Sequence, residues 1–274
     1  PHFLDIQNGL NNNGQLILQN NNSLIQHNDL AVNSGAGIFK MLRETQQVFR
    51  FDYTYWSSPV ENQDLHLLSP NTFYDKYYSW NAIASPQVWL GHNRAIPSAP
   101  TSPSVTMTPG KGFIIRSPQS FSIESPSATP SIFTAEFIGK PNNGIVSVPI
   151  VGGTEKWNLI GNPYPSAINA NLFLSDDAND DVVEGTIYFW THNTPLIATP
   201  GGITDYSYSP ADYAVYNFSG ATSTAPAASG SGSGNNNAMP NGFIAAGQSF
   251  FIKGTGGGTA VFKNAMRVTN NNNQ

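Results

Sequence analysis

An internal duplication constrains the fold of this chain more than any other feature of its sequence. The stretch from Trp157 to Ile168 reads as an apolar strand that enters a Gly-Asn-Pro turn with two closely spaced prolines. An aromatic strand, small polar turn residues, a proline and an aliphatic residue recur in the same order from Tyr53 to Val60. Both stretches are followed by the same series of patterns, so we expect two structurally related units.

The apolar segments of both units are short, and none keeps a 3.6-residue period. Such segments, separated by Gly, Pro and Asn, are typical of β-strands joined by tight turns. The sequence therefore predicts an all-β fold of two related antiparallel β-sandwiches of jelly-roll type, in which alternate residues of each strand are buried. The first predicted sandwich spans residues 51–150 and the second spans residues 151–274.

Several segments of the second unit match segments of the first. The strand from Gly185 to Trp190 corresponds to that from Tyr77 to Trp80, and Pro240 to Lys253 corresponds to Met107 to Arg116. The Asn143-Gly144 pair is a strong hairpin signal before the strand at 145–150. Residues 219–237 are almost wholly Ser, Gly, Ala, Thr, Pro and Asn, which predicts a long surface loop whose deletion leaves folding unchanged.

An Asn-rich segment, residues 1–50, precedes the duplicated units. Its short apolar pulses predict strands, and a disordered low-complexity arm is the alternative. Residues 1–18 lie outside the duplicated pattern, yet Phe3, Leu4, Ile6 and Leu10 need burial. We therefore expect this segment to donate a strand to a neighbouring subunit and to mediate self-association. A strand that folds back onto its own first sandwich is the alternative.

The composition excludes several classes of partner and chemistry. Charged residues make up 11% of the chain, the net charge is −5, and the Lys and Arg residues are scattered. We therefore expect no nucleic-acid partner and no binding to anionic lipid. The absence of cysteine excludes disulfides and thiolate chemistry. No apolar run is long enough for a membrane helix, so no membrane insertion is expected, and the first residue, Pro1, suggests a processed or truncated chain.

One acidic segment resembles a cation-binding loop. Asp177, Asn179 and Asp181 have the 1, 3, 5 spacing of calcium ligands. Val182 stands where such a loop needs Gly, and Tyr188 stands where it needs a bidentate Glu. A calcium site and a solvated acidic loop thus remain alternatives, and no other cofactor is expected.

No catalytic motif is complete in the sequence. The five histidines lack the spacing of metal pairs, and no nucleophile elbow or phosphate loop is present. Asp52, Glu136 and Asp212 would suit glycoside hydrolysis only if they met in space. We therefore predict a protein without enzymatic activity.

The five tryptophans allow two interpretations. Most of them lie in predicted strands and would fill a sandwich core that has no disulfides. Trp89, between Pro86 and Gly91, lies in a loop-like sequence and is the candidate for stacking on a surface glycan.

A set of phrases resembles a β-rich module of bacterial surface proteins that are exported by type IX secretion. The phrases are Tyr55-Trp56-Ser57-Ser58-Pro59-Val60, Leu68-Ser69-Pro70-Asn71-Thr72, Gly110-Lys111-Gly112-Phe113, Gly139-Lys140-Pro141-Asn142-Asn143-Gly144, Asn158 to Ile168, Tyr188 to Asn193, Asp212 to Asn217 and Met266-Arg267-Val268. In that family the module precedes a C-terminal sorting domain that is cleaved after export. The resemblance implies an extracellular location at the bacterial cell surface and brings no enzyme chemistry with it.

These observations together favour a structural role. We expect a secreted surface subunit that self-assembles into a fibre or pilus-like filament through head-to-tail contacts. A carbohydrate-binding or adhesin module of a larger surface protein is the alternative.

Overall fold

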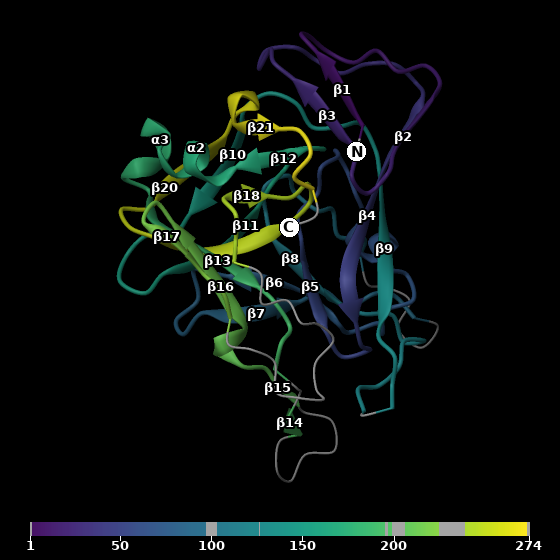
Figure 1. Ribbon diagram of the computed structural model, residues 1–274, viewed down its shortest axis with the longest axis vertical. Coiled ribbons are helices and arrows are strands. Elements are labelled where there is room, and N and C mark those ends of the chain that lie inside the picture. The colour runs from purple at the N-terminus through teal and green to yellow at the C-terminus, as the bar shows by residue number, and fades with distance from the viewer. Residues whose placement is uncertain are drawn as a thin grey trace.

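The computed structural model is an all-β protein whose sheets are mainly antiparallel, as the sequence predicts (Figure 1). It describes residues 2–96, 103–125, 127–194, 197–198, 206–224 and 239–272. The helices are single turns, which agrees with the absence of a 3.6-residue apolar period. None of the helices in these ranges is long and apolar enough to cross a membrane.

The elements follow one another in two similar series. The N-terminal strands are β1 (Phe3–Ile6), β2 (Gln15–Leu18), β3 (Ser23–Gln26) and β4 (Ile38–Val48). The first unit continues with β5 (Tyr53–Trp56), α1 (Leu65–Leu68), β6 (Tyr77–Asn81), β7 (Val88–Gly91), β8 (Phe113–Arg116) and β9 (Ser131–Ile138). The second unit contains β10 (Val146–Ile150), β11 (Trp157–Gly161), β12 (Ala167–Asn169), α2 (Ala170–Leu174), α3 (Asp177–Asp180), β13 (Val183–Trp190), β14 (Ile197–Ala198), β15 (Tyr206–Ser207), η1 (Pro210–Asp212), β16 (Tyr213–Asn217), β17 (Gly220–Thr222), β18 (Phe243–Ile244), β19 (Ser249–Gly254), β20 (Gly258–Phe262), η2 (Asn264–Met266) and β21 (Arg267–Val268).

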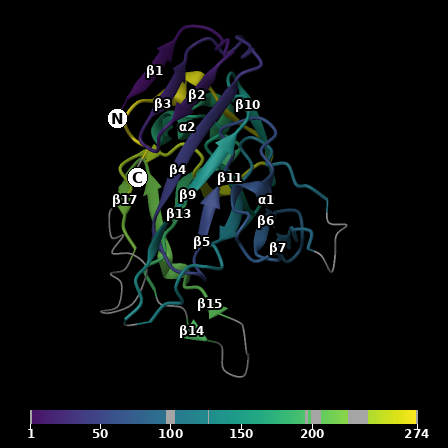
Figure 2. The same ribbon diagram turned by 90° about the vertical axis from the view of Figure 1, so that its right-hand side faces the viewer.

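The duplication in the sequence is also a duplication of strand order. The central sheet of the first unit has the order β5-β8-β6-β7, and that of the second has the order β11-β19-β13-β16, with β17 added at its end. In each unit a further antiparallel pair lies outside the central sheet, β4 with β9 and β10 with β20. The pair of β4 with β9, side by side in Figure 2, crosses the predicted boundary at residue 50.

The inner strands of each central sheet are buried on both faces. In the first unit, Trp56 and Phe113 point into a core that β4 and β9 also line, through Met41 and Phe137. The second unit has an equivalent core, lined by Ile160, Ile187 and Phe250 of the central sheet and by Val148 and Phe262 of the outer pair. The opposite faces of the two central sheets pack against each other through Tyr55, Ile114, Leu159 and Phe251.

The contact between the units is reciprocal, as in a two-fold symmetric interface. Trp80 Nε1 donates to the backbone oxygen of Trp157 at 2.9 Å, and its counterpart Trp190 Nε1 donates to that of Tyr53 at 3.1 Å. Ser57 N–H likewise donates to Gly247 O, and its counterpart Gly161 N–H donates to Gly110 O. The aromatic residues of this face therefore dock the two units. Most tryptophans were expected in a sandwich core, but only Trp56 lies in one, whereas Trp80, Trp157 and Trp190 lie in this contact.

The N-terminal strands have a different organisation from the rest. β1 pairs with β3 and β2 pairs with β4, and both pairs are parallel. Residues 2–18 and 22–41 thus form two stacked coils, which we call coil 1 and coil 2. They lie at one end of the molecule (Figure 1). The predicted strand donor β1 is paired inside its own chain, but with β3 of the N-terminal segment and not with a strand of the first sandwich, which was the alternative.

One turn prediction was wrong, and one loop prediction falls mostly outside the described residues. Asn143-Gly144 does not close a hairpin, because β9 and β10 pair with other strands; the turn connects the two units instead. The adjacent Asn142 is buried and donates to Ser58 O and Pro163 O, so it ties the connection to both units. The predicted loop at 219–237 begins with β17, which pairs with β16, while its residues 225–237 lie outside the described ranges.

Candidate functional site

Coil 1 and coil 2 are joined by a continuous ladder of backbone hydrogen bonds. Ser23 N–H donates to His2 O, Ser34 N–H to Leu10 O and Ile38 N–H to Gly14 O, so these bonds lie before β1, between β1 and β2, and at the start of β2. Phe3 pairs with Ser23 and Gln15 pairs with Ile38, which sets the coils 20 and 23 residues apart in sequence. This is the arrangement of a short β-solenoid.

Amide side chains hold the turns of the two coils together. Asn28 Nδ2 donates to Asn8 Oδ1 at 3.0 Å, one coil above the other. Asn33 is buried, and its Oδ1 accepts from Leu10 N–H at 2.7 Å and from Gln26 Nε2 at 2.8 Å. Gly35 has φ +96°, and a Cβ there would lie 2.1 Å from Asn12 O. The Asn-rich composition of this segment therefore serves coil stacking.

The outer side of coil 1 is open. In the part of the chain that the structure describes, no strand pairs with the second edge of β1 or of β2. The inward side chains of coil 1, Leu4, Ile6, Leu10 and Leu16, are only half-buried. Leu24, Gln26 and Phe39, which pair with Leu4, Ile6 and Leu16 one coil further in, are buried. The outer side of coil 1 thus presents both unpaired backbone groups and exposed apolar surface.

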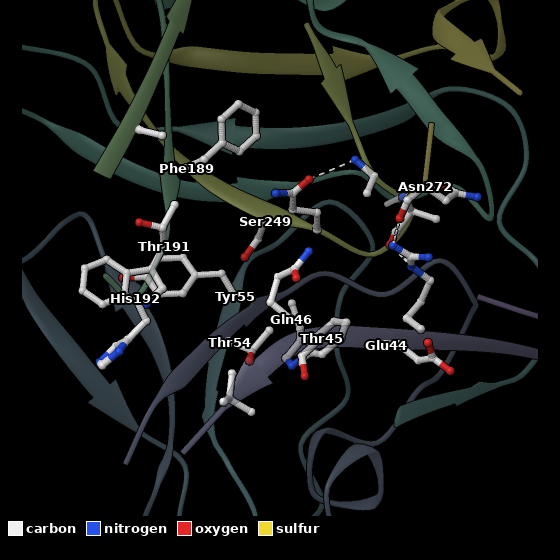
Figure 3. Close-up of a pocket in the computed structure, with 18 of the residues that line it drawn as sticks. Glu44, Thr45, Gln46, Thr54, Tyr55, Phe189, Thr191, His192, Ser249 and Asn272 are labelled. Carbon is white, nitrogen blue, oxygen red and sulfur yellow. Dashed lines mark hydrogen bonds between the residues drawn. The ribbon is translucent and has the colours of Figure 1, made fainter. Parts of the chain in front are cut away.

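A groove of about 460 Å³ lies between β4, β5, β13 and the segment 239–249. Gln46, Thr54, Tyr55 and Ser249 gather around it (Figure 3). The hydroxyl of Ser249 is buried and has no hydrogen-bond partner among the described residues. The groove therefore combines polar side chains with an aromatic wall, a combination that suits a polar ligand with an apolar face.

The charged groups beside this groove have structural partners. Arg43 is buried, and its guanidinium donates to the backbone oxygens of Asn20, Ala246 and Asn272. Burial lowers the pKa of Arg43 to about 10. These bonds tie β4 to the C-terminal segment, so Arg43 has few donors left for a ligand.

His192 lies at the end of the groove and is buried next to a carboxylate. Its Nε2 is 3.2 Å from Asp52 Oδ1, and both side chains are almost fully buried. Asp212 lies near this pair, accepts from Thr194 Oγ1 at 2.7 Å, and has a pKa raised by burial. Glu136 is elsewhere and forms an ion pair with Lys40. The structure therefore does not unite the three carboxylates considered for glycoside hydrolysis.

The calcium candidate has a different local structure from the predicted loop. Asp177 and Asn179 lie in α3, which Asp176 caps, and Asp181 follows its last turn. Asn179 is buried: its Oδ1 accepts from Val261 N–H at 2.7 Å, and its Nδ2 donates to Phe173 O. The amide between the two aspartates thus fastens α3 to β20. Within the described ranges, no group of three or more acidic or histidine side chains converges as metal ligands.

Trp89 lies in β7, an edge strand, and not in a loop. Its side chain is 36% exposed, and its ring contacts Trp80 at 5.0 Å and Phe251 at 5.8 Å between centroids. It does not line the groove. Trp89 therefore belongs to the rim of the aromatic contact between the units, with one part of its surface open to solvent.

The predicted self-association residues lie together in coil 1. Phe3 is 55% exposed, whereas Leu4, Ile6 and Leu10 point into the coil. The roles of Leu16 and of the asparagines were not predicted from the sequence. The recurrence of Leu4 at Leu24, within similar Asn-rich surroundings, was the signal that could have found them.

Comparison with known proteins gives one match. A family model described as a domain of unknown function (DUF8693) matches residues 2–274. No curated protein and no solved structure matches the chain significantly. Because the matched range covers both units and the N-terminal coils, the protein belongs to the DUF8693 family.

Proposed function

We propose that the protein is a non-enzymatic structural subunit of the bacterial cell surface that joins its neighbours in an extracellular fibre. The observation that carries the proposal is the open outer side of coil 1 at one end of the molecule (Figure 1). Unpaired strand edges recruit further strands, and natural proteins usually protect them. The resemblance to modules exported by type IX secretion supports the location.

A head-to-tail contact needs a second, different surface on the same subunit. β7 is an exposed edge strand, with Val88 at 44% and Leu90 at 48% exposure. Pairing between coil 1 of one copy and β7 of the next would be heterologous, so it would propagate without closing. In this form of the proposal β1 stays paired with β3, and the edge itself makes the contact instead of a donated strand.

Light scattering over a concentration series and electron microscopy of the purified protein test this proposal. We expect elongated assemblies that grow with concentration. Leu90→Lys should abolish them, because a charge on an edge strand opposes pairing. Leu67→Lys is the matched control, since Leu67 is 71% exposed and lies outside the strands. A protein that remains monomeric at high concentration would refute self-assembly.

Saccharide binding in the groove is a second candidate function. It is favoured by the unpartnered, buried hydroxyl of Ser249 beside Gln46 and the ring of Tyr55. Glycan-array binding by monomeric protein that is lost in Ser249→Ala would support this candidate. Loss of binding in Trp89→Ala with retention in Ser249→Ala would place the site on the exposed face of Trp89 instead.

A further inference from the structure

We infer that the open side of coil 1 is built to receive one more coil of a parallel β-solenoid. The partner is thus a polypeptide whose terminal coil presents two strands in the same direction as β1 and β2. The inference rests on the proposed structural role of the N-terminal end, but not on self-assembly. It follows from three features of coil 1: the direction of its strands, the exposure of its interior, and its turns.

The direction of the free backbone groups defines the first feature. Ile38 N–H donates to Gly14 O in the register that pairs Gln15 with Ile38. In a parallel ladder, alternate residues of a strand direct their backbone N–H and C=O groups toward one neighbour. The backbone groups of Leu16 and Leu18 therefore face β4, and those of Ile17 face outward. By the same rule, the bond from Ser23 N–H to His2 O means that the backbone groups of Phe3 and Asp5 face outward. β1 and β2 therefore offer a second parallel ladder on their free side.

The interior of the coil is the second feature. Leu4 stacks on Leu24 and Leu16 stacks on Phe39, but nothing in the described part of the chain stacks on Leu4 and Leu16 from the other side. A single added strand would pair with only β1 or β2 and would leave these side chains half-exposed. One further coil would cover both strands and the apolar interior between them at once.

A second copy of the chain does not meet this requirement with its own coils. Coil 2 is covered on its far side, because β4 pairs with β9 and Leu24 N–H donates to Pro165 O. Of its two coils, a second copy could therefore offer only coil 1, and two identical faces would meet about a two-fold axis with their strands antiparallel. A parallel ladder therefore requires a partner that exposes the other face of a coil, the face that corresponds to the covered far side of coil 2.

The turns of coil 1 are the third feature. Asn28 of coil 2 bonds to Asn8 of coil 1 through their side-chain amides. Asn11 and Asn13 lie in the exposed turn before β2, and Asn13 Nδ2 donates to Asn11 Oδ1 at 3.0 Å. Stacked asparagines extend readily into ladders between successive coils. The matching partner would therefore carry Asn or Gly in its turns and a spacing near 20 residues, as between Phe3 and Ser23.

A fused coil tests the inference on the full chain. The probe is a duplicate of residues 3–22 inserted before Phe3, and the control is a scrambled insert of the same composition. We expect amide hydrogen exchange at Phe3, Asp5 and Ile17 to slow by about 100-fold with the duplicate, as for amides that enter a ladder. The scrambled insert should leave these rates unchanged. Equal rates with both inserts would overturn the inference.

Ile17→Pro keeps the test specific to the outward ladder. Proline removes a donor that faces away from β4, so the variant should fold as the parent does, and Ile17→Val is its control. The duplicate coil should then protect Asp5 less in Ile17→Pro than in Ile17→Val, and equal protection would refute pairing along β2. Filaments formed by a protein whose fused coil stays unprotected would refute the inference alone. The fused coil covers the face that the head-to-tail contact uses, so self-assembly is tested on the parent chain. A monomeric parent together with a protected fused coil would refute self-assembly alone.

Discussion

The side chain of Gln87 caps the outer edge of the second central sheet at Trp157, and its removal should have a measurable cost. β11 is the outer strand of that sheet. Trp157 N–H donates to Gln87 Oε1 at 3.0 Å, and Gln87 Nε2 donates to Trp157 O at 3.0 Å. Gln87 Nε2 also donates to Ala82 O at 2.8 Å. One side chain of the first unit thus satisfies both backbone groups of an edge residue in the second.

Gln87→Met keeps the length of the side chain and removes these bonds. Each partly exposed hydrogen bond contributes about 0.5–1 kcal/mol, so we expect the free energy of unfolding to fall by about 1–2 kcal/mol. For a protein of this size that corresponds to a Tm lower by about 3–6 °C. Gln15→Met is the control, because Gln15 is exposed and has no side-chain partner among the described residues; it should change the free energy of unfolding by less than about 0.5 kcal/mol.

A double-mutant cycle then separates the hydrogen bonds from packing. Trp80 Nε1 also donates to Trp157 O, so this oxygen keeps a donor in either single variant, Gln87→Met or Trp80→Phe. In the double variant it has neither donor, and we expect an extra loss of about 1 kcal/mol beyond the sum of the single effects. Urea denaturation measures all four proteins. Additive losses, or a Gln87→Met variant as stable as the Gln15→Met control, would refute this account of the edge.

Three further variants test packing and burial. Gly161→Ala should lower the free energy of unfolding by about 1–3 kcal/mol, because the new Cβ would lie 2.6 Å from Ser57 Cβ. Gly185→Ala is the control and should be tolerated, since its Cβ meets no atom within 4 Å. Equal thermal stability of the two variants would contradict this. Burial raises the pKa of Tyr213 to about 12. This pKa is above the value of about 10 in the unfolded chain, so the contribution of Tyr213 to stability is full below pH 10 and is lost as the pH rises toward 12. The Tm should therefore fall less steeply between pH 10 and 12 in Tyr213→Phe than in the parent. Trp56→Ala should cost about 3–5 kcal/mol in urea denaturation, since Trp56 is 5% exposed in the first core, and a loss below 1 kcal/mol would be inconsistent with that packing.

The sequence was a good guide to the strands of the two units and a poor guide to what the turns connect. Alternating residues such as Tyr55 and Trp56 follow from the geometry of any strand, so the predicted segments were found in place. The Asn143-Gly144 pair predicts a hairpin, but β9 and β10 each pair with a strand far away in the chain. Local turn chemistry specifies a reversal and leaves the pairing to the sheets.

The candidate sites show the same division. The spacing of Asp177, Asn179 and Asp181 suits a cation, yet the position of Asn179 against Val261 uses its amide for packing α3. Because α3 and β20 are far apart in the chain, no local sequence pattern predicts that contact. Conversely, the polar groove near Ser249 draws its residues from strands of both units, and no segment of the sequence contains its signature.

The sequence alone determined that this chain is all-β, that it is duplicated, and that it needs burial for Leu4, Ile6 and Leu10 at its N-terminal end. Strand periodicity and repeated motifs are local, and these conclusions depend on nothing else. Only the tertiary structure decided that the N-terminal strands are parallel and that two aromatic sheet faces meet. A strand has the same pattern whether its neighbour runs parallel or antiparallel, and an apolar face does not specify which other face will cover it. Those choices depend on which edges and faces remain free once the rest of the chain has folded.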